Sequence, residues 1–217
     1  MPRKTYRRKK TYRKHNQPWF KNANSAYKLA VRAAKDIWYL KGLVNSEMLH
    51  RTNSGTTTTN STGTMTLLNG FSQNDTDNGR TGNSVLMRNV LIRLVFTQHP
   101  TAISTQYRVM VIQDTQQISD TNPSVTDILE SANPLSTLKV GNAGRFKILK
   151  TWMFTTDDDK GQTKVINYYK DMRMHTRFNG IADTDIQKNG LYLVTICNQA
   201  TNTPTMDFYW KVGYHDN

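Results

Sequence analysis

The chain has 217 residues, 36% of them hydrophobic, which suits one folded domain plus a tail and excludes a wholly disordered protein. It has no run of about 18 apolar residues, so we expect no membrane-spanning helix and no membrane partner. The start, Met-Pro-Arg-Lys, lacks an apolar leader, so we expect no secretory signal. The single cysteine, Cys197, excludes an intrachain disulfide, and its apolar surroundings predict a buried side chain.

The net charge of +13 is concentrated at the N-terminus. No acidic residue precedes Asp36, whereas the rest of the chain has 17 basic and 16 acidic residues. Such a division predicts that the N-terminal segment binds a polyanion, namely nucleic acid. The twelve candidate nucleic-acid-binding residues are Arg3, Lys4, Arg7, Arg8, Lys9, Lys10, Arg13, Lys14, Lys21, Lys28, Arg32 and Lys35.

Residues 1–21 are predicted to be a disordered arm, because like charges repel and few apolar groups are available for burial. Aromatic residues such as Tyr6, Tyr12 and Trp19 are interleaved with the charges, and bases of a single strand can stack on these rings. The run Arg7–Lys10 also fits a nuclear localisation signal. The two interpretations are compatible.

Residues 22–45 are predicted to be an amphipathic cationic segment, helical over 22–44. Ala26, Leu29, Ala33 and Ile37 follow the helical period, while a second stripe carries three cations at positions i, i+4 and i+7. These cations are Lys28, Arg32 and Lys35. They favour a nucleic-acid-binding face, and the alternative is the solvated face of an ordinary surface helix.

Residues 46–217 are predicted to be an all-β shell domain. Threonine, serine, asparagine and glycine become common there, and apolar runs alternate with turn residues. A short helix is predicted at 124–131, where Ser124 and Asp127 have capping-box spacing. Eight strands with long connections favour an antiparallel jelly-roll sandwich. The predicted strands lie near 47–52, 64–70, 86–97, 106–113, 145–156, 164–175, 191–198 and 206–214.

No pattern typical of an enzyme is present. The five histidines have no paired zinc-ligand spacing, and neither a Gly-x-Ser-x-Gly elbow nor a phosphate-binding loop occurs. The run Asp157–Asp159 precedes Lys160 and Gly161, which indicates a solvated hairpin tip rather than a cation site. We therefore expect no catalytic residues, and a binding function.

Several short segments, in this order and spacing, resemble the coat proteins of the satellite tobacco necrosis virus type, including relatives from small circular single-stranded DNA viruses. The resemblance covers most of the chain and is clearest between about Asn53 and Phe154. Its segments are Asn53–Gly55, Thr66–Gly70, Arg80–Gly82, Asp114, Pro123–Leu129 with Ala132 and Asn133, and Arg145–Lys150.

The resemblance implies a capsid protein that forms a T=1 icosahedral shell of sixty identical subunits around single-stranded RNA or DNA. The basic segment would face the interior and supply on the order of 700 positive charges, which suits a genome of roughly a thousand nucleotides. The protein would reside in the virion and, before assembly, in the host cytoplasm or nucleus.

The resemblance also implies calcium between subunits. The matching positions are the backbone carbonyls of Thr81 and Ser84 and the carboxylate of Asp216, and oxygen ligands of this kind suit calcium. A glutamate of the family has no clear counterpart, because Glu47 is displaced in the sequence.

Two other classes of protein fit the same composition. A cellular nucleic-acid-binding β module with a basic tail is one, although such a module usually carries a basic patch on its folded surface as well. A jelly-roll carbohydrate binder is the other, and it would leave the basic arm without a role.

Overall fold

The computed structural model describes residues 23–44, 48–118, 121–159 and 161–216. The predicted arm, residues 1–21, lies outside the described residues, as does Glu47. The chain consists of two units, Met1–Ser46 and Glu47–Asn217. Neither helix in the described part of the chain has the length and apolarity needed to cross a membrane.

The first unit contains helix α1, Ala23–Val44, where a helix was expected over 22–44. Its side chains from Tyr27 to Leu40 are exposed, including the large apolar groups of Ile37 and Trp38. A single helix cannot bury its own apolar stripe, so most of the stability of such a helix comes from packing of that stripe against another protein surface.

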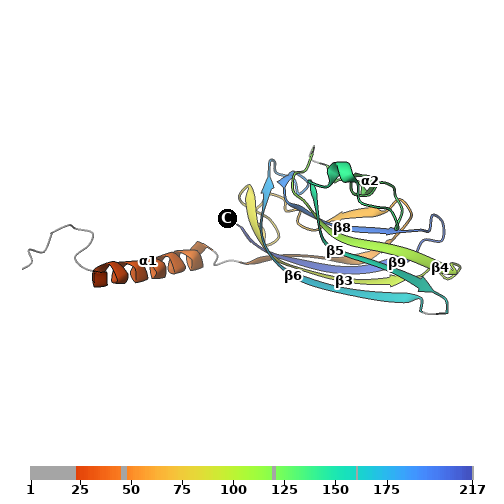
Figure 1. Ribbon diagram of the computed structural model, residues 1–217, viewed down its shortest axis with the longest axis horizontal. Helices are drawn as coiled ribbons and strands as arrows, with labels where there is room; N and C mark the ends of the chain where they lie inside the picture. Colours follow the sequence, from red (N-terminus) through yellow and green to blue (C-terminus); the bar gives the residue numbers. More distant parts are fainter. Residues whose placement is uncertain (1–22, 45–47, 119–120, 160, 217) are drawn as a thin grey trace, which may run out of the picture. The chain divides into compact units, whose positions relative to one another are not determined.

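The second unit is a sandwich of two antiparallel sheets (Figure 1). The five-stranded sheet has the order β1 (Leu49–Thr58), β9 (Thr205–Asp216), β3 (Ser84–Thr97), β6 (Thr163–Phe178) and β7 (Ile186–Lys188). The four-stranded sheet has the order β2 (Thr64–Leu67), β8 (Gly190–Cys197), β4 (Ser104–Asp114) and β5 (Phe146–Asp157).

This topology confirms the predicted jelly roll. The first strand, β1, pairs with the last, β9. Strands β1 to β4 alternate between the two sheets, β5 stays beside β4 in the four-stranded sheet, and β6 returns to the five-stranded sheet, as in a jelly roll. All eight predicted strands are present. The short β7, which was not predicted, pairs with the end of β6 at Arg177 and Phe178.

Alternation of side chains places the main core between the sheets. In β3 the buried residues Val90, Ile92 and Leu94 alternate with more exposed neighbours. A register shift between Met87 and Asn89 keeps Met87 on the buried side as well. Cys197 is fully buried in β8, as its apolar surroundings predicted.

A second, smaller core lies on the outer side of the four-stranded sheet. There Met110, Tyr192 and Val194 pack against Val125 and Ile128 of helix α2. Figure 1 shows α2 above β8, in the long β4–β5 connection. All residues of β8 are buried because this sheet is covered on both sides.

The helix predicted at 124–131 is shorter than expected and spans Val125–Ile128. Asp127 accepts hydrogen bonds from the backbone N–H and the hydroxyl of Ser124, both 2.8 Å long, which fixes its start. The helix ends early because Leu129 has an extended backbone and forms a β-bridge with Leu138. A 3₁₀ turn, Val140–Asn142, follows before β5.

Candidate nucleic-acid interface and metal site

Of the twelve predicted nucleic-acid-binding residues, nine lie in the arm and outside the described residues. The other three, Lys28, Arg32 and Lys35, are exposed on α1. With a rise of 1.5 Å per residue, they extend along about 10 Å of one side of the helix. The first turn of α1 has no acidic residue, so the positive end of the helix dipole adds to this cationic character.

The residues predicted to bind calcium come together at one end of the five-stranded sheet. Asp216 ends β9 and pairs with Val85, so it lies beside Ser84 at the start of β3. One carboxylate oxygen of Asp216, Oδ2, accepts hydrogen bonds from the backbone N–H of Thr81 (2.7 Å) and from its hydroxyl (2.5 Å). The Ser84 hydroxyl lies 3.3 Å from Nδ1 of His175.

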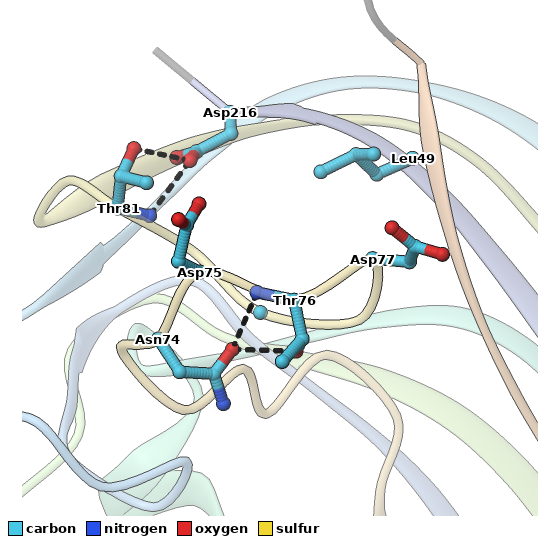
Figure 2. A pocket seen from close by; sticks show the side chains of 8 residues that line it. Leu49, Asn74, Asp75, Thr76, Asp77, Thr81 and Asp216 are labelled. Atoms are coloured by element: carbon cyan, nitrogen blue, oxygen red, sulfur yellow. Dashed lines mark hydrogen bonds between the residues drawn. The ribbon is translucent and has the colours of Figure 1, made fainter.

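A cavity of about 330 Å³ opens beside Thr81 and Asp216, with Asp75 and Asp77 in its wall (Figure 2). The second carboxylate oxygen of Asp216, Oδ1, is buried and has no hydrogen-bond partner in the described residues. The Thr81 carbonyl accepts one hydrogen bond, 2.8 Å long, from the side-chain amide of Gln73 and keeps one lone pair. These oxygens are of the type that calcium prefers.

The acidic side chains near Asp216 do not by themselves form a metal-binding cluster in the described part of the chain. Among residues 23–44, 48–118, 121–159 and 161–216, no three His, Cys, Asp or Glu side chains come together as a set that could hold a metal ion. Calcium ligands here would therefore have to include carbonyl oxygens or groups from a neighbouring subunit, as the sequence resemblance implies.

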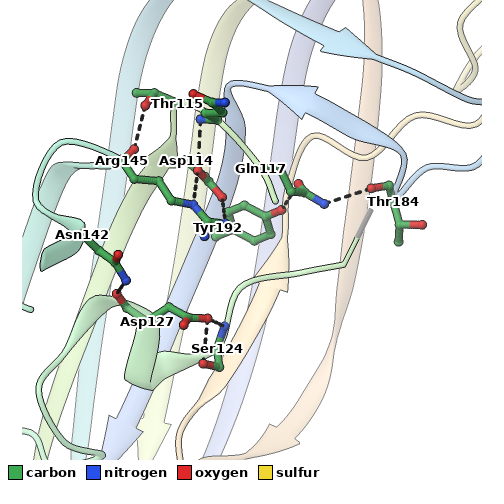
Figure 3. Close-up of polar contacts among 10 residues, drawn as sticks. Asp114, Thr115, Gln117, Ser124, Asp127, Asn142, Arg145, Thr184 and Tyr192 are labelled. Atoms are coloured by element: carbon green, nitrogen blue, oxygen red, sulfur yellow. Dashed lines mark hydrogen bonds and ion pairs between the residues drawn. The ribbon is translucent and has the colours of Figure 1, made fainter. Parts of the chain in front are cut away.

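A buried polar network fixes the connection that covers the four-stranded sheet (Figure 3). Asp114 pairs with Arg145, and the Tyr192 hydroxyl donates a 2.7 Å hydrogen bond to the side-chain oxygen of Gln117. Burial raises the pKa of Tyr192, and the nearby Asp114 carboxylate raises it further, so this phenol is neutral at physiological pH. The network ties the ends of β4, β5 and β8 together and is structural.

Arg80 is a structural residue that no local sequence pattern indicated. Its guanidinium is fully buried, lies 4.1 Å from the centre of the Phe178 ring, and donates hydrogen bonds to the carbonyls of Phe71, Gly82 and Gly180. Arg80 belongs to one of the segments that carry the resemblance, but only the fold shows that it is enclosed.

Fold and charge together define the class of this protein. The jelly roll is an architecture of viral capsid and lectin domains, and here it follows a segment rich in cations. Residues 28–217 match the satellite tobacco necrosis virus coat protein family, so the chain belongs to that family. A search of curated proteins found no match.

The protein is therefore a viral coat protein, a structural component of the virion. The matched region begins at Lys28 and so includes the three cations of α1 as well as the whole sandwich. Membership of this coat protein family favours a capsid protein over the two alternatives, a cellular nucleic-acid-binding module and a carbohydrate binder.

Proposed function

We propose that the protein assembles into a T=1 shell of sixty copies and packages a single-stranded genome through its basic N-terminal segment. The observation that carries this proposal is the charge division: twelve cations and no acid precede Asp36, while the rest of the chain is nearly neutral. The cationic segment would neutralise phosphates inside the shell, and the sandwich would tile with copies of itself.

The central experiment is expression of the full chain, electron microscopy of the product, and nuclease treatment of the extracted nucleic acid. Closed particles of T=1 geometry that contain nucleic acid support the proposal, and digestion by RNase or by DNase decides the type of genome. Monomers under all buffer conditions, or empty shells as stable as filled ones, contradict it.

The role of the arm needs a matched charge control. Replacing Arg7, Arg8, Lys9 and Lys10 by Gln removes four charges from the arm. Replacing Lys147, Lys150, Lys164 and Lys170 by Gln removes four exposed charges from β5 and β6. We expect the arm variant alone to package less nucleic acid. Equal packaging by both variants contradicts the proposed role of the arm.

The subunits would reside in the host cytoplasm or nucleus before assembly, with Arg7–Lys10 as the nuclear signal. A fluorescent fusion of the wild-type chain should accumulate in the nucleus if this run is a signal. The arm variant should then be excluded from the nucleus.

We also propose that calcium binds between subunits at Asp216, with the carbonyls of Thr81 and Ser84. The unpartnered Oδ1 of Asp216 beside an acidic cavity supports this second proposal. Calcium should raise the melting temperature of wild-type particles and EGTA should reverse the rise. Asp216→Asn should abolish this calcium-dependent shift, whereas the exposed Asp159→Asn should keep it. A full shift in Asp216→Asn particles contradicts the site.

A further inference from the structure

The two outer surfaces of the sandwich differ in how the chain covers them. Helix α2 and its flanking residues cover the four-stranded sheet. The five-stranded sheet has no comparable apolar cover from residues 48–118, 121–159 and 161–216, and on its outer side Tyr169 and Tyr209 are 59% and 37% exposed. We call the outward side chains of β1, β9, β3, β6 and β7 the open face.

Strand register places two cations near two tyrosines on the open face. Residues directly opposite each other in neighbouring strands share a face, about 5 Å apart. Leu91 is opposite both Lys211 and Tyr169, and Arg93, two residues further along β3, is opposite Tyr209. Lys211 and Arg93 therefore lie diagonally on neighbouring strands. Arg93 is directly beside Tyr209, and Leu91 lies between Lys211 and Tyr169.

A second group of cations lies on the same face at β6 and β7. Arg173 and Arg177 alternate with the buried side chains of Met172 and Thr176, so both point outward. Arg177 is directly opposite Lys188 of β7. Like charges opposite each other destabilise a sheet. A bound anion would reduce this repulsion.

The open face lacks matching negative charge. Its two carboxylates, Asp171 and Asp207, accept hydrogen bonds from the Tyr169 hydroxyl (2.7 Å) and the Thr56 hydroxyl (2.5 Å). In the part of the chain that the structure describes, the cations of the face form neither an ion pair nor a side-chain hydrogen bond. These cations are Arg93, Arg173, Arg177, Lys188 and Lys211. The near-neutral total charge of the sandwich thus hides a locally cationic surface.

We propose that the open face is a second binding surface for single-stranded nucleic acid, with bases stacked on Tyr169 and Tyr209 and phosphates bound by the neighbouring cations. The proposal rests on the packaging function and adds a contact outside the arm. Aromatic rings beside cations are the combination that single-strand-binding surfaces use.

Charge favours nucleic acid over the other occupants of this face. Helix α1 carries Lys28, Arg32 and Lys35, so it would bring like charge to the cations of the sheet. A second copy of the sandwich would bury unpaired arginine and lysine groups, which is costly unless carboxylates meet them. A polyanion brings opposite charge to this face, so it avoids both the like-charge repulsion and the burial of unpaired cations.

The test uses the full chain in the unassembled state and a fluorescent single-stranded oligonucleotide, with affinity measured over a range of salt concentrations. Each cation lost from a single-strand interface makes the negative slope of log K against log [salt] shallower by about 0.7, so R93Q/K211Q should lower the magnitude of the slope by about 1.4. R173Q/R177Q/K188Q should lower it by about 2. The control K147Q/K150Q removes two exposed lysines of β5 and should leave the slope unchanged.

The stacking part of the proposal has its own test. Y169A/Y209A should weaken binding by about fivefold or more for each stacked base, and Y169F/Y209F should restore it because the ring is kept. Ultraviolet crosslinking followed by mass spectrometry should recover nucleotides on the peptides that contain Tyr169 and Tyr209. Circular dichroism should show that each variant folds.

The outcomes separate this inference from the role of the arm. Loss of affinity in the open-face variants supports the inference, even if neutralising Arg7–Lys10 has no effect and the arm proposal fails. Binding equal to the K147Q/K150Q control overturns it. Open-face variants that bind the oligonucleotide normally but fail to assemble would show that a neighbouring subunit covers this surface, which also overturns it.

Discussion

Arg145 and Asp114 form a two-pronged ion pair across the ends of β4 and β5 (Figure 3). Arg145 Nε lies 2.9 Å from Oδ1 of Asp114, and Nη2 lies 2.6 Å from Oδ2. The Asp114 side chain is fully buried and that of Arg145 is 16% exposed. The hydrogen bonds with Asp114 raise the pKa of Arg145, so the guanidinium stays charged, and the pair closes the base of the connection that carries α2.

Asp114→Asn should destabilise the subunit strongly. It removes the negative member of a buried pair and leaves the Arg145 charge uncompensated, for which a loss of about 3–5 kcal/mol is typical. Urea unfolding of unassembled subunits measures this loss. Asp159→Asn, at an exposed hairpin position, should change the free energy of unfolding by less than about 0.5 kcal/mol. A similar small change at Asp114 would show that the pair does not hold the connection.

Arg80→Lys should also destabilise the sandwich, although the charge is conserved. The flat guanidinium reaches several carbonyls at once and stacks on Phe178, whereas an ammonium cannot do both. Burial lowers the pKa of Arg80 without removing its charge at neutral pH. We expect a loss of about 2–4 kcal/mol in chemical unfolding. The exposed Arg93→Lys is the matched control, and equal stability of the two variants would contradict this account.

Gly63→Ala should cost more than an ordinary glycine substitution. Gly63 has a φ of +76°, and an added Cβ would lie 2.8 Å from Cγ2 of Val125 in α2. Backbone strain and the clash together should lower stability by about 1–3 kcal/mol and lower the melting temperature. Gly141→Ala meets nothing within 4 Å and should be nearly neutral. A neutral Gly63→Ala would mean that the loop and α2 can move apart freely.

Local sequence patterns predicted eight of the nine strands in the described part of the chain but not the contacts between distant strands. The run Val90–Phe96, rich in β-branched and aromatic residues, predicted β3. The Thr-rich end of β1 reads as a loop and becomes a strand only because β9 pairs with it as far as Thr58. The three residues of β7 are too few to form a recognisable pattern. The burial of Arg80 and the alignment of Arg177 with Lys188 depend on contacts between distant segments, which no local window contains.

The candidate site residues also form two groups: those that a local sequence pattern shows, and those that only the fold brings together. The charge division and the helical spacing of Lys28, Arg32 and Lys35 are visible in the sequence because they are local. The cations of the open face are dispersed among acidic residues along the chain, so the total charge of the sandwich conceals them. Only the register of β3 against β6 and β9 shows that Arg93 and Lys211 lie together.

Tyr214 should make the sandwich sensitive to alkaline pH. Burial and then the nearby Asp216 carboxylate raise its pKa to about 12, and its hydroxyl donates a 2.6 Å hydrogen bond to the Gly79 carbonyl. In the unfolded chain a tyrosine has a pKa of about 10. The folded state therefore binds more protons between these values, so stability is complete below about pH 10 and falls as the pH rises toward 12.

Tyr214→Phe removes this titration together with the hydrogen bond. We expect a loss of about 1 kcal/mol at pH 7, and a shallower decline in the free energy of unfolding between pH 10 and 12 than in the wild type. Urea unfolding at a series of pH values measures both effects. Tyr209→Phe, which removes an exposed hydroxyl of the same strand, should follow the wild-type curve. A decline in Tyr214→Phe as steep as in the wild type would assign the alkaline sensitivity to other groups, with Tyr192 the first to examine because burial raises its pKa as well.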